Sequence, residues 1–361
     1  MQIMPEFGLA GAEIMAENLT YELIKQGLDV KVVSLYNYYS AITDRLERNN
    51  IKIYYLNKKS GLDFSQIFRL YKVFKAEKPD VVHTHRYVME YVIPAAVMAR
   101  VPVRIHTVHN IAKKENCMIH RKLNKLFYKL CDVIPVSLSP VVQTTVMEEY
   151  KLKSEDTPVV YNGIDLENCI PKRGYESNTK TFTYLHIGRF AQAKNHSGLL
   201  EAFKIVHEKR SNTRLVLIGD GDLVDNIREK VFELGLNNCV IFLGSQDSVY
   251  NYLYDADVFV LPSLYEGMPM TLIEAMATGL PIVTTNVGGI QDMIENGVNG
   301  LITSVDKDAI AAALLCLEED EELRRKLGNA AIIASKNFSS TIMAKKYISI
   351  YNNYFSTICG E

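Results

Sequence analysis

The 361-residue sequence lacks several features that would point to particular classes of protein. Its six cysteines are scattered and form no C-x-x-C pair, which argues against a disulfide framework or a zinc site and favours reduced thiols in a cytosolic protein. We recognise no signal peptide and no long apolar span, so the sequence predicts neither export by that route nor a membrane crossing. A net charge of −2 argues against a general nucleic-acid binder.

Short β-branched runs alternate with helical patterns along the whole chain. Several runs are continuously apolar, as strands covered on both faces should be, so they predict parallel sheets joined by helical crossovers. The expected strands lie at 28–35, 51–56, 80–85, 101–108, 132–137 and 157–162, and then at 181–188, 213–220, 239–244, 257–263, 280–285 and 300–304.

A chain of this length is long for one hydrophobic core, so we expect two domains. The fold class predicted is α/β, with two doubly wound Rossmann-like domains, residues 1–163 and 164–338, facing across a cleft. The polar stretch 162–180 lacks a clear period and is interpreted as the linker. A final helical pattern within 339–361 could pack back on the first domain.

Two strand-to-helix turns carry features of phosphate sites, because free N–H groups at a helix N-terminus favour negative charge. In "FGLAGAEIMAENL", Gly8 and Gly11 precede a helix, either as a phosphate loop or as an ordinary tight turn. In "LHIGRFAQAKN", Gly188 ends an apolar strand and is followed by Arg189 and Lys194, which together suit a diphosphate. The alternative is a pair of solvated cations. His196 and His207, in the next helix, are interpreted as solvated.

The stretch "LYEGMPMTLIEAM" places Glu266 in a loop and Glu274 about one turn into a helix that starts near Pro269. Carboxylates close to a diphosphate would repel it, but an ionised carboxylate can accept bonds from the hydroxyls of a diol. A ligand that combines a diphosphate with diols is a nucleotide sugar. The alternative is that both glutamates stabilise the helix N-terminus, each by less than about 1 kcal/mol.

Taken together, these motifs resemble a known family. "GRFAQAKN" followed by "PSLYEGMPMTLIEAMATGLPIVTTNVGGIQDMIENGVNG" is very similar to the retaining glycosyltransferases of family 4, which have the GT-B fold. "GAE", "DVVHTH", "TVHN", "NGID" and "IGDGD" agree in order. The resemblance covers essentially the whole chain and is most specific over 182–303.

The resemblance implies roles for individual residues. Arg189 and Lys194 would hold the donor diphosphate, Glu274 the ribose hydroxyls and Glu266 the hydroxyls of the donor sugar, while His109 would reach that sugar from the first domain. The further donor-binding positions that it implies are Gly11, Gly188, Gly244, Gly267, Met268, Met270 and Thr271.

Three positions depart from the family pattern. Ala10 stands where the family has the first glycine of a pair, Asn110 replaces an aspartate that often follows the histidine, and Pro269 cannot donate an N–H. Retention by double displacement would need a protein nucleophile, and the sequence offers no clear candidate. The resemblance favours front-face attack, in which a donor phosphate oxygen helps to take the acceptor proton.

Other polar motifs are open to more than one interpretation. "DAD" at 255–257 has the D-x-D form of a metal site, but Asp257 starts an apolar strand and Asp255 ends a helix, so we expect no required metal or other cofactor. "GDGD" at 219–222 predicts a turn and a helix cap. His83 and His85 share one face of a strand, where they would contact an acceptor or, alternatively, be packed inside or solvated.

The segment 113–130 predicts a basic amphipathic helix with Ile119, Leu123, Phe127 and Leu130 as its apolar stripe. Around the stripe lie Lys113, Lys114, Arg121, Lys122, Lys125 and Lys129. Such a helix either docks on its own domain by the stripe or lies on anionic lipid.

The sequence as a whole predicts a retaining, metal-independent glycosyltransferase. It would move a sugar from a nucleotide-diphosphate donor, expected to be a UDP-sugar, to a hydroxyl of a glycan or lipid-linked acceptor in cell-surface polysaccharide or glycolipid synthesis. We expect a cytoplasmic protein that could work at the inner face of the membrane and does not bind nucleic acid. Two alternatives are a nucleotide-sugar epimerase on the same fold and a catalytically silent nucleotide-sugar-binding subunit.

Overall fold

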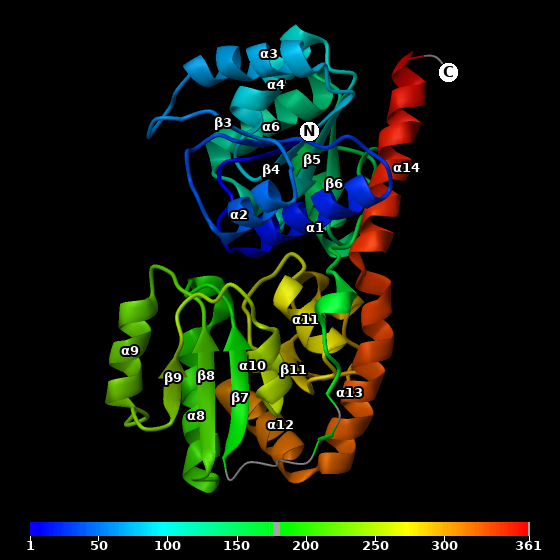
Figure 1. Cartoon of the computed structure of the whole chain (residues 1–361). Helices are drawn as coiled ribbons and strands as arrows, with labels where there is room; N and C mark the ends of the chain where they lie inside the picture. Colours follow the sequence, from blue (N-terminus) through cyan, green and yellow to red (C-terminus); the bar gives the residue numbers. More distant parts are fainter. Residues whose placement is uncertain (173, 176–180, 360–361) are drawn as a thin grey trace. The chain divides into compact units, whose positions relative to one another are not determined.

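The computed structural model describes residues 1–172, 174–175 and 181–359 (Figure 1). It divides into two compact units, which we call unit 1 (residues 1–163 and 340–361) and unit 2 (residues 164–339). The C-terminal helix therefore belongs to the same unit as the N-terminal strand. Of the predicted linker, residue 173 and residues 176–180 lie outside the described part of the chain.

Unit 1 contains a parallel sheet of six strands in the order β3-β2-β1-β4-β5-β6. The strands are β1 (Gln2–Met4), β2 (Val32–Ser34), β3 (Ile53–Tyr55), β4 (Val81–His85), β5 (Val103–Val108) and β6 (Val133–Ser137). The helices are α1 (Gly11–Lys25), α2 (Ala41–Arg48), α3 (Ser65–Glu77), α4 (Met89–Ala99), α5 (Ala112–Glu115), α6 (Met118–Leu130), α7 (Pro140–Tyr150), the 3₁₀ turn η1 (Ser154–Asp156) and α14 (Ser340–Cys359).

Unit 2 repeats this topology, with a parallel sheet of six strands in the order β12-β11-β10-β7-β8-β9. The strands are β7 (Phe182–Ile187), β8 (Thr213–Ile218), β9 (Val240–Phe242), β10 (Val258–Leu261), β11 (Ile282–Thr285) and β12 (Leu301–Thr303). The helices are α8 (His196–Lys209), α9 (Val224–Glu233), α10 (Tyr250–Asp255), α11 (Met270–Ala277), α12 (Lys307–Glu319) and α13 (Glu321–Ser335). The 3₁₀ turns are η2 (Leu166–Asn168), η3 (Gln192–Lys194), η4 (Gly288–Asp292) and η5 (Lys336–Phe338).

The buried surfaces follow from the apolar patterns. Every residue of β10 is fully buried, which explains why its sequence is a continuous apolar run instead of an alternating one. In α1, the stripe of Met15, Leu19 and Leu23 is buried at helical spacing. Tyr347 and Tyr351 of α14 are buried in the same way, and this helix lies along α1 (Figure 1).

One predicted strand is wrong. Residues 157–162 form a single bridge between Val159 and Ser137, at the end of β6, and not a seventh strand. The other strand predictions are confirmed, in shortened form, by β2 to β12. Pro158 explains the failure, because proline has no N–H to donate to a ladder.

In both sheets the order in which the chain adds strands reverses at the centre, and this reversal determines where a site can form. In unit 1 the chain runs outward from β1 to β3 and returns to place β4 on the other side of β1. In unit 2, β7 and β10 occupy the equivalent positions. The connections that leave the carboxyl ends of these strands run in opposite directions along the sheet, and open α/β sheets bind their ligands at such a point.

Candidate functional site

In unit 2, two loops leave the carboxyl ends of the central strands. Residues 188–195 lead from β7 into α8, and residues 262–269 lead from β10 into α11. Backbone and side-chain bonds tie the two loops together. The N–H of Leu264 donates to the carbonyl of Ala193 at 2.7 Å, and the Asn195 amide donates to the carbonyl of Pro262 at 3.1 Å. Asn195 also caps α8 by accepting the N–H of Gly198.

Lys194 and Glu266 meet between these loops. Lys194 Nζ lies 2.5 Å from Glu266 Oε1, and the side chains are only 18% and 9% exposed. Ser263 Oγ donates to the same oxygen at 2.6 Å. Within the described residues no hydrogen bond reaches Glu266 Oε2. The structure therefore brings two of the predicted site residues into direct contact and fixes Glu266 through one oxygen.

Glycines allow other loops to pack against this pair at very short range. A Cβ on Gly288, which has φ +55°, would lie 1.9 Å from the carbonyl oxygen of Glu266, and a Cβ on Gly219 would lie 2.1 Å from that of Gly188. Gly289 donates to Gly267, and Gly219 donates to Gly244, so both loops are also hydrogen-bonded. Gly188, Gly244 and Gly267 were predicted as donor-binding positions from the family resemblance, whereas Gly288 and Gly289 had no role assigned from the sequence.

Glu274 has a different environment. It lies in α11, is 5% exposed, and has no hydrogen bond or ion pair to its carboxylate from any described residue. Burial raises its pKa to about 7. Glu274 also lies beyond the first turn of α11, which contains no acidic residue, so its position argues against the interpretation that it stabilises the helix N-terminus. Glu274 is suited to accept bonds from a neutral donor such as a diol.

Most of the remaining predicted residues of unit 2 lie on the same two loops or at the start of α11. Arg189 is about half exposed, lies 3.5 Å from Asp222 and is not hydrogen-bonded to the Lys194–Glu266 pair within the described chain. A Cβ on Gly188 would contact the Lys194 side chain at 3.3 Å. Met268 and Met270 are buried, and Thr271 lies in the first turn of α11.

Two sequence expectations for unit 2 are wrong. His196 is buried and not solvated, because its ring stacks on Phe190 with the centroids 4.1 Å apart. "GDGD" does form a turn, in which Asp220 accepts the N–H of Gly221, but it does not cap α9, whose N-cap residue is Leu223 without a side-chain cap.

In unit 1, histidines gather where β4 and β5 end. His85 Nδ1 lies 3.1 Å from His109 Nε2, and His85 Nε2 lies 2.8 Å from Gln2 Oε1. His83 contacts the hydroxyl groups of Tyr351 at 2.8 Å and Thr107 at 2.7 Å. Both ring nitrogens of His83 and of His85 are thus bonded inside unit 1.

This bonding corrects the prediction that His83 and His85 contact an acceptor directly. Both side chains are almost completely buried, so no ring nitrogen is left for a ligand. Burial also lowers the pKa of His85 to about 3, so its ring is neutral at physiological pH. His109, by contrast, keeps part of its surface accessible.

Charged groups that the sequence analysis missed surround these histidines. Glu13, in the first turn of α1, is buried and ion-paired with Arg86, which follows β4 in a left-handed conformation (φ +58°). Glu115 Oε1 accepts the backbone N–H of His109 at 3.2 Å, and burial raises its pKa to about 7. Only the position of Glu13 in "GAE" gave a signal in the sequence.

The predicted phosphate loop leads into α1 at Gly11. The N-cap residue, Ala10, has extended backbone and makes no side-chain cap bond. The N–H groups of the first turn are therefore not capped by that side chain, as expected where an anion binds. Asn110 uses its side-chain oxygen to accept the N–H of Ile111 at 2.8 Å.

Asp257, of the D-x-D motif, has a structural partner. Its Oδ2 accepts the backbone N–H of Thr183 at 2.7 Å, which links the start of β10 to β7. Among the described residues, no group of histidine, cysteine, aspartate or glutamate is arranged to hold a metal ion.

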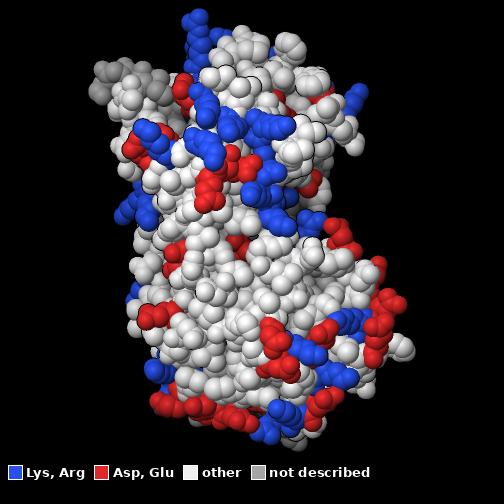
Figure 2. Space-filling view, turned by 180° about the vertical axis from the view of Figure 1, so that it is seen from behind, with Lys and Arg blue, Asp and Glu red and all other residues white. Residues whose placement is uncertain are grey.

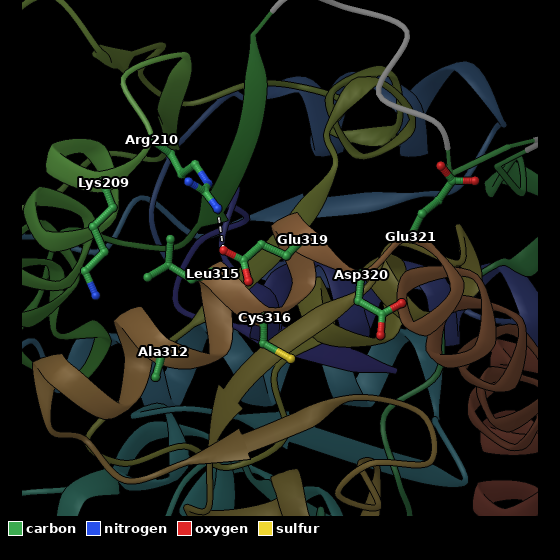
Figure 3. Close-up of a pocket in the computed structure, with 8 residues that line it drawn as sticks. All are labelled: Lys209, Arg210, Ala312, Leu315, Cys316, Glu319, Asp320 and Glu321. Atoms are coloured by element: carbon green, nitrogen blue, oxygen red, sulfur yellow. Dashed lines mark hydrogen bonds and ion pairs between the residues drawn. The ribbon is translucent and has the colours of Figure 1, made fainter.

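A hollow between α8 and α12 is separate from this site (Figure 3). It lies beside the C-terminus of α8, where the chain enters β8, and so at the amino end of the strands. Arg210 and Glu319 form an exposed ion pair across it, 2.5 Å apart. The candidate site is at the opposite, carboxyl edge of the sheet.

Comparison with known families identifies the class of protein. Residues 9–168 match the family described as Glycosyltransferase Family 4, and residues 171–333 match the one described as Glycosyl transferases group 1. The chain belongs to the family 4 glycosyltransferases with the GT-B fold, and it is a glycosyltransferase.

Individual relatives fit this assignment. The chain is 30% identical to UDP-Gal:alpha-D-GlcNAc-diphosphoundecaprenol alpha-1,3-galactosyltransferase of Escherichia coli, over 78% of this chain and 75% of the relative. It is 28% identical to N-acetyl-alpha-D-glucosaminyl L-malate synthase of Bacillus anthracis, over 95% and 94%. Its fold is similar to that of Anabaena HepE in complex with UDP and glucose, with a TM-score of 0.84, 20% identity and coverage of 98% of both chains.

The raised pKa of Glu274 leads to a prediction that does not depend on activity. A carboxyl whose folded pKa of about 7 exceeds its unfolded value contributes stability below the unfolded pKa and loses it as the pH rises through 7. Glu274→Gln removes this loss. Its free energy of unfolding, relative to wild type, should therefore rise between pH 5 and pH 8.5 by up to about 3 kcal/mol. Urea denaturation at both pH values measures the difference; Glu208→Gln, at an exposed position, is the control, and a pH-independent difference for Glu274→Gln contradicts the assignment.

Proposed function

We propose that this glycosyltransferase transfers a sugar, with retention of the anomeric configuration and without a required metal, from a UDP-sugar to a hydroxyl of a lipid-linked or glycan acceptor. The observation that carries the proposal is the Lys194–Glu266 pair between the loops that follow β7 and β10, together with the buried Glu274 in α11, the helix into which the second loop leads. The product would enter cell-surface polysaccharide or glycolipid synthesis, and the reaction would take place at the cytoplasmic face of the membrane.

Named relatives support the choice of substrates. The Escherichia coli relative is named as a UDP-galactose-dependent enzyme that acts on a diphosphoundecaprenol-linked sugar. A Campylobacter jejuni relative, 27% identical over 64% of this chain, is named as a transferase acting on a diphospho-undecaprenol substrate. Structures similar to this fold were solved with UDP and with UDP-glucose.

Different side chains of unit 2 would contact different parts of the donor. Lys194 has further N–H donors besides the one that it gives to Glu266, so it can also contact a diphosphate. Stabilisation of the charge that develops on the leaving diphosphate accelerates the transfer. Glu266, fixed through Oε1, would present Oε2 to a sugar hydroxyl, and Glu274 would accept the ribose diol.

The environment of Glu266 also bears on the stereochemistry. A carboxylate that formed a covalent glycosyl intermediate would have to give up its bonds to Lys194 and Ser263 on the same oxygen or react through the other one. Its buried ion pair favours a fixed role in binding. We therefore propose front-face attack, in which a donor phosphate oxygen takes the acceptor proton.

Contact with a membrane is proposed through α6. The prediction of a single docked stripe is only partly right, since Phe127 is buried and Leu123 partly so, while Ile119 and Leu130 are 75% and 71% exposed. Met118 and Leu126 are exposed as well. The exposed face thus mixes large apolar side chains with lysines, as an interfacial helix does.

The distribution of charge also supports a membrane contact through α6. Lys122 and Lys129 of α6 are exposed, Lys125 is partly exposed, and α6 itself contains no acidic residue. Lys and Arg side chains gather on the face of unit 1 that Figure 2 shows. None of the described helices combines the length and the apolar character that a membrane span requires. We propose that α6, through its lysines and exposed apolar side chains, makes a surface contact with the membrane that carries a lipid-linked acceptor.

The stereochemistry and the alternatives can be tested together. We expect purified protein, incubated with a UDP-sugar and an N-acetylglucosaminyl diphospholipid acceptor after treatment with a chelator, to give a product with the anomeric configuration of the donor. Nuclear magnetic resonance of the product determines this configuration. An inverted product contradicts the mechanism, an epimerised free donor indicates the epimerase, and donor binding without turnover indicates the silent subunit.

The role of Lys194 predicts a large kinetic effect. Lys194→Ala should reduce kcat/KM by about 10²–10³, because a charge-stabilising donor at the leaving group is lost and Glu266 is left unpaired. Steady-state rates at saturating acceptor measure this. Lys204→Ala, in α8, the helix that follows Lys194 in the chain, is the control and should keep near-normal activity. Near-normal turnover of Lys194→Ala would remove this residue from the mechanism.

The membrane contact predicts a charge-dependent effect. The double variant Lys122→Glu/Lys125→Glu should bind vesicles with 30% anionic lipid at least 10-fold more weakly than wild type, since about 1 kcal/mol is lost for each basic residue removed and the acids add repulsion. Vesicle co-sedimentation measures the binding. Lys307→Glu/Lys326→Glu changes the net charge equally at exposed positions of unit 2 and should bind like wild type. Equal binding by all three proteins contradicts the assignment.

A further inference from the structure

Three side chains in unit 1 form a continuous hydrogen-bonded line that ends at His109. Gln2 Oε1 lies 2.8 Å from His85 Nε2, and His85 Nδ1 lies 3.1 Å from His109 Nε2. Gln2 and His85 are buried, with 2% and 0% of their surfaces exposed. Neither contact is required by the sheet, because both are made by side chains.

The direction of each bond follows from what Gln2 can offer. An amide oxygen only accepts, so His85 Nε2 must carry the proton and donate to Gln2. A neutral imidazole has one N–H, which leaves His85 Nδ1 as an acceptor. His109 Nε2 must then donate to it, and His109 Nδ1 carries the lone pair. The reverse arrangement would place two bare acceptors, His85 Nε2 and Gln2 Oε1, 2.8 Å apart.

Gln2 also contacts Tyr351 of α14. Because the amide oxygen Oε1 faces His85 Nε2, the amide N–H₂ is the group that can donate to the Tyr351 hydroxyl. Burial raises the pKa of the Tyr351 phenol well above its usual value, and this hydrogen bond from Gln2 acts against that rise. The Tyr351 hydroxyl then donates a hydrogen bond to His83 Nδ1 at 2.8 Å, and His83 Nε2 donates one to the Thr107 hydroxyl at 2.7 Å. One assignment of protons to these side chains therefore satisfies every hydrogen bond of the network.

We propose that His85, oriented by Gln2 and Tyr351, is a positioning residue that holds His109 in the tautomer with the proton on Nε2 and the lone pair on Nδ1. This tautomer makes His109 Nδ1 an acceptor for a hydroxyl of a bound sugar. That consequence rests on the proposed function, whereas the tautomer itself does not. His85 would act through His109 and touch no substrate.

The tautomer can be observed directly by ¹⁵N nuclear magnetic resonance of protein labelled at histidine, at pH 8 and without donor or acceptor. The spectrum contains only eight histidines, and His109→Gln assigns the relevant signals. We expect one protonated nitrogen in His109, at Nε2. His85→Ala should mix the two tautomers, while His85→Asn, which places an amide oxygen near the position of Nδ1, should restore the Nε2–H form.

Two further variants keep the test independent of folding. Tyr351→Phe removes one hydroxyl, frees the Gln2 amide to rotate and should raise the Nδ1–H fraction of His109. His106→Asn is the matched control, because His106 is equally buried on β5 but bonds to Thr84, and it should leave His109 unchanged. A wild-type His109 with its proton on Nδ1, or an unchanged tautomer in both His85→Ala and Tyr351→Phe, overturns the proposal.

Kinetics add a second measurement if transfer is detected. His85→Ala should lower kcat about 10-fold more than His85→Asn, with a smaller change in the KM for the donor. Equal kcat values for these two variants would contradict the positioning role. If the protein transfers no sugar to any acceptor tested, this result contradicts the proposed function. The tautomer of His109 can still be determined by the spectroscopic test.

Discussion

The bond between Lys194 and Glu266 joins the two loops that leave the central strands of unit 2, and the proposed donor site depends on it. Each residue belongs to a different strand exit, and their contact occurs with little solvent access. Removal of one partner would leave an uncompensated charge in a mostly buried place, which is far more costly than the loss of a surface ion pair. The glycines at 219 and 288 serve the same junction, since any side chain there would drive a neighbouring loop away from it.

Partners also explain why similar side chains behave differently. Glu266 has a cation and a hydroxyl beside it, whereas Glu274, in the helix that follows, has neither within the described residues and titrates near neutral pH. In unit 1, His83 and His85 are kept neutral by burial, and neutral donors and acceptors satisfy them. The strand exits of unit 2 thus hold the Lys194–Glu266 ion pair, whereas His83 and His85 in unit 1 lie in a neutral network beside the Glu13–Arg86 ion pair.

Apolar runs were enough to predict the sheets, because a strand buried on both faces has an unmistakable composition. The periodicity of the sequence was a poorer guide to how deeply each side chain is buried. It placed His83 and His85 on one face but could not show that Tyr351, 268 residues from His83, covers that face. The same limit applies to α6, where periodicity identified the apolar residues but not which of them the neighbouring elements bury. Contacts between distant segments decide such questions, and a single sequence does not reveal them.

The C-terminal helix is where this limit matters most for function. Tyr347 and Tyr351 reach Thr107 and His83, so the polar interior of unit 1 is completed only by residues made at the end of synthesis. Contacts of such long sequence separation form slowly, because a large loop must close before they contribute. The strands of unit 1 can bury their apolar faces without these tyrosines, but Gln2 then keeps its bond to His85 and loses its contact with Tyr351. If His85 aligns His109 as proposed, packing of the sheet and alignment of His109 are separable, and α14 supports the second.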